Sequence, residues 1–133
     1  MQEHYVLTPA ESKRLIAKAI VEATEVSEAL ENGIVIVCTG STNAYVHEEL
    51  TGKTIEKWKF LTGRHTPRAG IVGDAGKKPC SEIPNLVFRN GRPDPKADWL
   101  DVLDDMGPGD VILKGANAIN YEKGQVGVLI GHP

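Results

Sequence analysis

Two stretches of the chain concentrate the side chains that can do chemistry. The first runs from Cys38 to Thr42 and reads Cys-Thr-Gly-Ser-Thr, between an apolar run and a helix-like segment. Backbone N–H groups at the start of a helix, together with the helix dipole, favour a bound phosphate or carboxylate. Hydroxyl side chains add donors there, but they also serve as ordinary helix caps. The stretch predicts either an anion site formed by Thr39, Gly40, Ser41 and Thr42 or a simple capped turn.

The second stretch carries Asp101 and Asp104, then Lys114, then Glu122. Carboxylates beside a lysine can move protons on a carbonyl substrate, and the ammonium group can stabilise the negative charge that develops. Asn117 lies among small residues, where its amide suits either a ligand contact or a tight turn. The open alternative for the whole stretch is surface charge on turns.

A basic segment in the middle of the chain reads "TGRHTPRAG". His65 can titrate near neutral pH, and Arg68 can clamp an anionic substrate. The same pattern is also typical of a solvated basic loop, so a substrate-binding role for both residues is one of two open interpretations.

The elements around the first stretch follow from hydrophobic patterning. Thr8-Pro9 begins a helix that apolar residues at helical spacing extend to Asn32-Gly33. Ile34 to Val37 is wholly apolar and β-branched, as expected of a strand covered on both faces. A second helix is predicted from Thr42 to Leu50. We therefore expect Ile34–Cys38 to be a central parallel strand that leads into a helix beginning near Thr42.

Further strands are predicted in the second half of the chain. Leu86 to Phe88 precedes an Asn90-Gly91 turn, Val111 to Leu113 follows a Pro-Gly-Asp turn, and Gln125 to Ile130 forms a buried-looking last strand. This order predicts a single α/β domain over residues 1–133, with a three-layer, Rossmann-like, mostly parallel sheet flanked by helices. Because the chain stops directly after an apolar strand, we expect a homo-oligomer or the N-terminal part of a longer protein.

Composition narrows the classes of partner. The 133 residues carry a formal net charge of -3, which disfavours nucleic-acid binding. Neither a membrane span nor a signal peptide is recognisable, so the cytoplasm is the expected compartment. The two cysteines form neither a disulfide framework nor a zinc pattern. The expected partner is a small anionic substrate, with no metal and no cofactor.

Taken together, the two stretches resemble the ribose-5-phosphate isomerase A family, whose wider group includes glucosamine-6-phosphate deaminase and the coenzyme A transferases. The resemblance covers roughly residues 12–50 and 101–131. It implies a phosphate loop at Thr39–Thr42, an acidic pair at Asp101 and Asp104, a substrate lysine at Lys114 and a base at Glu122.

Two functions remain open at this point. The first is an enzyme with isomerase-type proton transfer, in which Asp104 or Glu122 is the base and Lys114 stabilises an enediolate. The second is a non-catalytic module that senses such a ligand or assembles with a partner.

Overall fold

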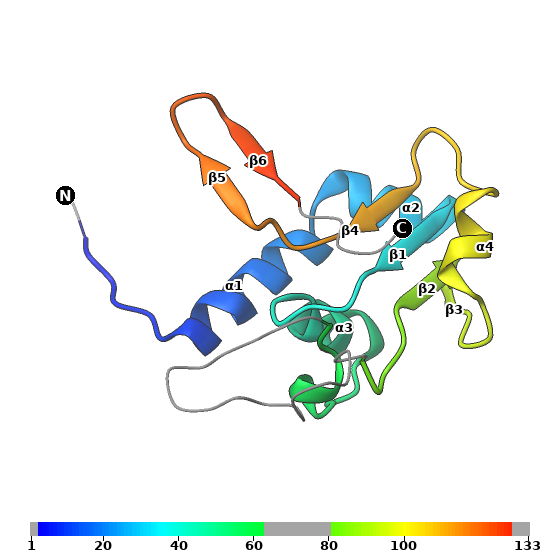
Figure 1. Cartoon of the computed structure of the whole chain (residues 1–133), viewed down its shortest axis with the longest axis horizontal. Helices are drawn as coiled ribbons and strands as arrows, with labels where there is room; N and C mark the ends of the chain where they lie inside the picture. The colour runs from blue at the N-terminus through cyan, green and yellow to red at the C-terminus, as the bar shows by residue number, and fades with distance from the viewer. Residues whose placement is uncertain (1–2, 63–80, 129–133) are drawn as a thin grey trace, which may run out of the picture.

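The computed structural model describes residues 3–62 and 81–128 (Figure 1). The helices and strands follow in this order: α1 Pro9–Val21, α2 Thr24–Asn32, β1 Ile34–Val37, α3 Asn43–Thr51, a 3-10 helix Lys57–Lys59, β2 Leu86–Arg89, β3 Arg92–Pro93, α4 Trp99–Leu103, β4 Val111–Leu113, β5 Ala118–Asn120 and β6 Gln125–Gly127. Helices and strands thus mix along the chain, and the predicted α/β class is confirmed at this coarse level.

The main sheet has four strands in the order β3-β2-β1-β4. The β1 strand is central, as predicted, and all four of its residues are buried. It runs parallel to β4 with Val35 opposite Val111, but antiparallel to β2 with Val37 opposite Leu86. The β2–β3 pair is also antiparallel. The sheet is therefore mixed, and the mostly parallel arrangement is not confirmed by the described strands.

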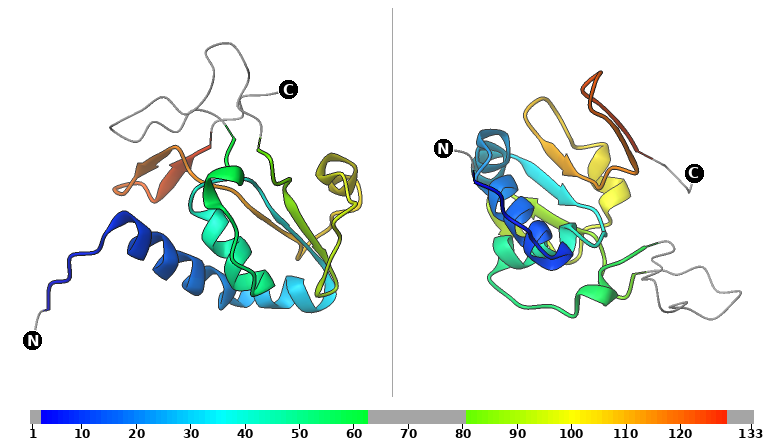
Figure 2. Two further views of the ribbon diagram at one scale, coloured as in Figure 1. Left: turned by 90° about the horizontal axis from the view of Figure 1, so that it is seen from below. Right: turned by 90° about the vertical axis from the view of Figure 1, so that its left-hand side faces the viewer.

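Two apolar cores lie on opposite faces of this sheet. On one face, Val35 and Val37 pack with residues of α1, α2 and α3, together with Phe60. On the other face, Ile34 and Ile36 pack with Val102 of α4. Figure 2 shows the short helix α4 on the far side of the sheet from the three longer helices. Alternate residues of β1 therefore face different cores, which explains why the whole strand is apolar.

The first helical segment is broken where the sequence predicts one continuous helix. Thr8 caps α1 as expected, through a reciprocal capping box with Glu11. However, α1 ends at Val21, and Ala23 adopts an extended conformation with φ -64° and ψ 137° before α2 begins. The break lets α1 pack against α3 while α2 packs against the sheet. A single straight helix would not cover both surfaces.

Two turn predictions are confirmed. The helix α3 begins at Asn43, one residue from its predicted start, and the strands β2 and β3 are joined at Asn90-Gly91. Both turn residues have positive φ, 48° and 75°, as a two-residue hairpin of the type I′ class requires. The Asn-Gly sequence is therefore a direct local cause of the antiparallel β2–β3 pair.

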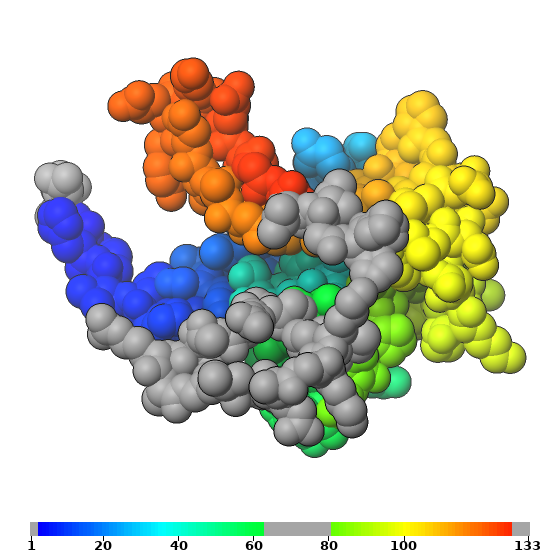
Figure 3. Space-filling model, viewed as in Figure 1, coloured from blue at the N-terminus to red at the C-terminus, as the bar shows by residue number. Residues whose placement is uncertain are grey.

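The prediction of a buried last strand is wrong for its described residues. The β6 strand pairs only with β5, in a separate two-stranded sheet, and all three residues of β6 are exposed. Val126 is 65% exposed and its cross-strand partner Ile119 is 56% exposed. Figure 3 shows this hairpin standing out from the rest of the molecule. Its apolar side chains have no packing layer beneath them in the described part of the chain.

Candidate functional site

The candidate site lies where β1 ends and α3 begins. Because β1 and β4 are parallel, Thr39 and Lys114 follow their strands at the same edge of the sheet. In α/β sheets, ligands usually bind outside the carboxyl ends of the parallel strands. The structure thus brings two of the sequence-predicted features, the hydroxyl-rich turn and the lysine, to the same edge.

The backbone donors of the turn divide into two sets. The Thr39 N–H donates to Asn85 Oδ1 at 2.8 Å, and the Gly40 N–H donates to the Phe60 carbonyl at 2.9 Å. These two donors are therefore engaged within the protein. The Ala44 N–H donates to the Gly40 carbonyl at 2.8 Å, which closes the first turn of the helix.

The N–H groups of Ser41, Thr42 and Asn43 belong to that first turn. None of them has a hydrogen-bond acceptor among residues 3–62 and 81–128. Free N–H groups are expected in a first helical turn, because no carbonyl precedes them along the helix. The hydroxyls of Ser41 and Thr42 likewise make no hydrogen bond to another described residue, and Thr42 does not cap the helix with its side chain. The candidate anion site thus narrows from Thr39–Thr42 to Ser41–Asn43.

Asn43 holds this turn against both parallel strands. It is buried, and its Nδ2 donates to the carbonyls of Cys38 and Leu113, each at 2.8 Å. The Cys38 N–H also donates to Leu113, at 2.9 Å. One amide therefore ties the start of α3 to the ends of β1 and β4. Asn43 was not among the site residues predicted from the sequence, although it directly follows the hydroxyl-rich stretch.

Two further residues at the turn were also missed. Asn85 accepts the Thr39 N–H, as described above, and Thr62 Oγ1 lies 2.7 Å from Thr39 Oγ1. Asn85 directly precedes β2, a position typical of a residue that ends a loop. No sequence signal linked Thr62 to Thr39, because the two are far apart in the chain.

Lys114 lies at the same edge but on the other sheet face from α3. Val111 and Leu113 pack on the α1–α3 side, so alternation turns Ile112 and Lys114 to the face that also holds Cys38. Burial raises the pKa of the Cys38 thiol, and the nearby Lys114 ammonium partly opposes this effect. A buried thiol with a raised pKa is a poor nucleophile.

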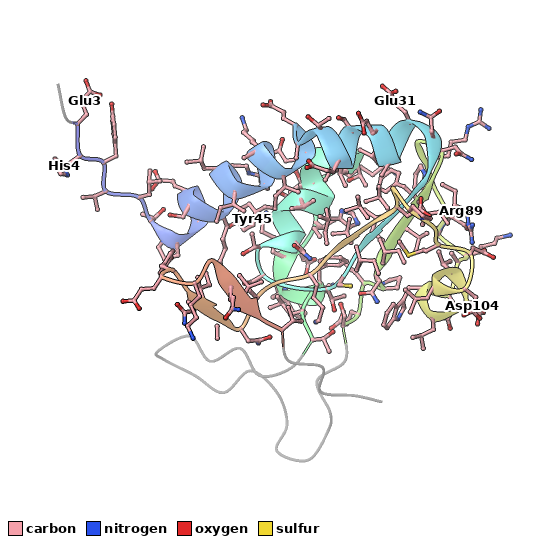
Figure 4. All side chains as sticks on the ribbon, turned by 90° about the horizontal axis from the view of Figure 1, so that it is seen from above. Glu3, His4, Glu31, Tyr45, Arg89 and Asp104 are labelled. Carbon is pink, nitrogen blue, oxygen red and sulfur yellow. The ribbon has the colours of Figure 1, made fainter. Side chains whose placement is uncertain are left out.

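The acidic residues of the second stretch are not brought to the α3 turn. Asp105 pairs with Arg89 at 2.6 Å, and Arg89 lies opposite Ile34, at the start of β1. Thr39 is five residues further on, which corresponds to about 16 Å along an extended strand. Asp104 caps the end of α4 beside Asp105, and Figure 4 shows it at the same end of the molecule as Arg89.

The remaining candidates lie elsewhere. Asp101 is exposed on α4, which covers the sheet face opposite α3. Glu122 is exposed in the turn of the β5–β6 hairpin. Asn117 is at the base of that hairpin, where its N–H donates to the Gly127 carbonyl at 2.8 Å. His65 and Arg68 lie outside the described residues.

A buried charge cluster on α3 was not anticipated from the sequence. Glu48 is 8% exposed and accepts hydrogen bonds from Arg14, from Lys57 Nζ at 2.6 Å and from the Ile55 N–H at 3.0 Å. The Arg14 and Lys57 cations also lie 4.7 and 4.8 Å from the ring centre of Tyr45. Within the described residues, the Glu48 carboxylate is held by two cations and one backbone N–H, so we interpret this cluster as structural.

The described residues contain neither a cluster of metal ligands nor a helix that could span a membrane. No group of three or more His, Cys, Asp or Glu side chains in residues 3–62 and 81–128 is arranged to hold a metal ion. No helix in the described part of the chain combines the length and the apolar character needed to cross a membrane.

Comparison of the chain with protein-family models, with curated proteins and with solved structures finds no match. The resemblance to ribose-5-phosphate isomerase A therefore stays a prediction from the two sequence stretches.

Proposed function

We propose that this chain binds a small phosphorylated or carboxylated metabolite at the first turn of α3. The observation that carries the proposal is the set of three backbone N–H groups, on Ser41, Thr42 and Asn43, that have no acceptor in the described part of the chain. They lie at the carboxyl edge of the parallel β1–β4 pair. N–H groups in this arrangement, aided by the helix dipole, are suited to an anion.

Rigid support of the turn favours ligand binding. The two Asn43 hydrogen bonds and the Gly40–Phe60 hydrogen bond fix the backbone on both sides of the free donors. A binding site whose donors are already held in place loses less conformational entropy when the ligand arrives. The half-buried hydroxyls of Ser41 and Thr42 supply additional donors at the same turn.

Binding without chemistry is better supported than proton transfer. An isomerase-type reaction requires a base within hydrogen-bonding reach of the substrate. Asp104 lies near the opposite end of β1, and Glu122 lies in an exposed hairpin turn. We therefore favour a ligand-sensing module over a sugar-phosphate isomerase, and we keep the cytoplasm as the proposed compartment.

Replacement of Thr42 separates the contribution of its N–H from that of its hydroxyl. Thr42 has φ -79°, within the range that proline adopts, and its N–H makes no bond within the helix. Thr42→Pro is expected to weaken phosphate binding by about 1.5–3 kcal/mol, because a hydrogen bond to a charged group is lost. Titration calorimetry with inorganic phosphate and with ribose 5-phosphate measures the change.

Thr42→Val is the matched control, because it removes the hydroxyl but keeps the N–H. Thr42→Val and Ser41→Ala are each expected to weaken phosphate binding by about 1 kcal/mol, because each removes one hydroxyl donor and keeps the backbone donors. Circular dichroism melts check that each variant keeps the fold. Wild-type protein that binds neither phosphate nor ribose 5-phosphate at millimolar concentration would disprove the anion site. Equal affinity of Thr42→Pro and Thr42→Val would show that the Thr42 N–H plays no part in binding.

A further inference from the structure

The two edges of the main sheet are built differently. One edge is β3, which consists of Arg92 and Pro93. A charged side chain and a proline are devices that keep an edge strand from pairing with another chain. The other edge is β4, whose residues Val111, Ile112 and Leu113 are all apolar. In the described part of the chain, β4 pairs only with β1, and no described strand pairs with its outer row of N–H and C=O groups.

The sequence around β4 is self-complementary when two copies of the strand pair antiparallel. Pairing about a two-fold axis at Ile112 sets Ile112 opposite its own copy and Val111 opposite Leu113 of the partner. It also sets Asp110 opposite Lys114 of the partner, so that each end of the paired strands carries opposite charges. Opposite charges across an interface fix the register and disfavour other pairings. Parallel pairing in register would instead set like charges together.

The side chains on this strand are suited to such an interface. Ile112 is 45% exposed, whereas all four residues of the neighbouring strand β1 are buried. Lys114 is exposed and forms no ion pair with a described residue. In an antiparallel pair, the two Ile112 side chains lie on the same face and contact each other. Pairing would cover an apolar surface and bring the free cation to an acidic group.

An acidic depression lies beside Asp110, directly before β4. It is lined by α2 and by the turn before β4, and its polar groups include Glu28, Asn32 and Asp110. Both carboxylate oxygens of Asp110 accept backbone N–H groups, from Ile34 at 2.6 Å and from Gly107 at 2.8 Å. These bonds hold the carboxylate in place and lower its pKa, yet each oxygen retains capacity for a lysine. The depression therefore provides fixed negative charge at the required end of the strand.

The β5–β6 hairpin extends the same surface. Figures 1 and 2 show it projecting past the carboxyl end of β4. Ile119, Val126 and Val128 are exposed on it by 56%, 65% and 44%. An isolated two-stranded hairpin is at best marginally stable in water. A partner seated on β4 would lie within reach of these side chains and would add area to a short strand pair.

We propose that β4 pairs antiparallel with β4 of a second copy of this chain, about a two-fold axis at Ile112, to form one continuous eight-stranded sheet. The partner's Lys114 then lies opposite Asp110, and the hairpin of each copy packs against the other. This inference is independent of the anion site, because Ser41–Asn43 lie at the start of α3, which packs on the sheet face opposite Ile112.

Disulfide cross-linking tests the register. In a Cys80→Ser background, in which the remaining Cys38 is buried, Ile112→Cys is expected to form a covalent dimer on mild oxidation. Only the residue on the two-fold axis faces its own copy closely enough for a disulfide. Lys114→Cys is the matched control on the same face. The two copies of residue 114 would be about 14 Å apart, and no cross-link is expected. A cross-link at residue 114 and not at residue 112 would overturn the proposal.

Sedimentation equilibrium tests the association itself. Wild-type protein is expected to be dimeric at high micromolar concentration. Ile112→Lys and Lys114→Glu are each expected to weaken the dimer by about tenfold or more, because each sets like charges together at the pair. Lys96→Glu makes the same charge change in the segment after β3, at the opposite edge, and is expected to have no effect. The proposal would be overturned if wild-type protein is monomeric. It would also be overturned if Lys114→Glu and Lys96→Glu both dimerise as strongly as wild type does. Circular dichroism melts confirm that the variants are folded.

Discussion

Glu48→Gln is expected to lower the free energy of unfolding by about 2–3 kcal/mol at neutral pH, because it removes the buried carboxylate that pairs with both Arg14 and Lys57. Burial of the Glu48 carboxylate raises its pKa, but the hydrogen bonds from Lys57, the Ile55 N–H and Arg14 together outweigh this effect. The pKa falls from an ordinary value of 4.5 to about 2. A shift of this size corresponds to about 3 kcal/mol of stability.

The pH dependence of this effect has a definite sign. A carboxylate with a lowered pKa in the folded state stabilises the fold at pH values above its unfolded pKa. The contribution of Glu48 is therefore complete above pH 4.5 and is lost as the pH falls toward 2. Chemical denaturation of wild-type protein and Glu48→Gln over this range is expected to show their difference in stability shrinking as the pH is lowered.

Glu49→Gln is the matched control, because Glu49 is the next residue of α3 and also pairs with Arg14, at 2.6 Å. Its side chain is more exposed than that of Glu48, 24% against 7%. A partly exposed pair contributes less, so a loss below about 1 kcal/mol is expected. Equal losses for the two variants would contradict the buried-cluster interpretation.

Local patterns predicted the elements around the candidate site. The apolar run at Ile34 and the hydroxyl-rich turn after it were sufficient to predict a central strand that leads into a helix near Thr42, and the helix begins at Asn43. The Asn90-Gly91 pair was sufficient to predict a hairpin. These features depend on a few adjacent residues, and steric and hydrogen-bonding preferences at that range are visible in a single sequence.

Contacts between distant residues account for what the sequence did not reveal. Nothing local showed that β2 returns antiparallel to β1, because that pairing joins Val37 to Leu86 across a long connection. The same holds for Asn85, whose side chain accepts the Thr39 N–H. That contact removes one predicted donor from the anion site. Hydrogen bonds to residues distant in the chain therefore decide which N–H groups of the predicted anion site are free to bind a ligand.

The break between α1 and α2 has a similar origin. Apolar spacing continues through Ala23, so periodicity alone predicts one helix. The chain bends because α1 and α2 pack against different elements, α3 and the sheet. The carboxylates of the second stretch were grouped by their order in the chain, whereas the fold separates Asp104 from Lys114 to different ends of the sheet.

Gly33→Ala is expected to destabilise the fold by about 2–3 kcal/mol, because an added methyl group would overlap Asp110. A Cβ at Gly33 would lie 2.4 Å from Asp110 Oδ1 and 3.3 Å from the Ala29 carbonyl oxygen. With φ -145°, the backbone of Gly33 is open to any residue, so the cost is one of space and not of conformation. The carboxylate cannot move aside without loss of its hydrogen bonds to the N–H groups of Ile34 and Gly107.

Two other glycines provide controls for this prediction. A Cβ at Gly40 would meet only Asn43 Cβ, at 3.9 Å, and a Cβ at Gly107 would meet no heavy atom within 4 Å. Gly40→Ala and Gly107→Ala are therefore expected to change the stability by less than about 0.5 kcal/mol. Urea denaturation of the three variants gives the comparison.

Asp110→Ala tests directly whether the overlap causes the loss of stability, because it removes the carboxylate that the new methyl group would meet. In that background Gly33→Ala is expected to cost much less than it does in wild type. If the cost of Gly33→Ala is unchanged by Asp110→Ala, the close approach of Gly33 to Asp110 does not constrain this position.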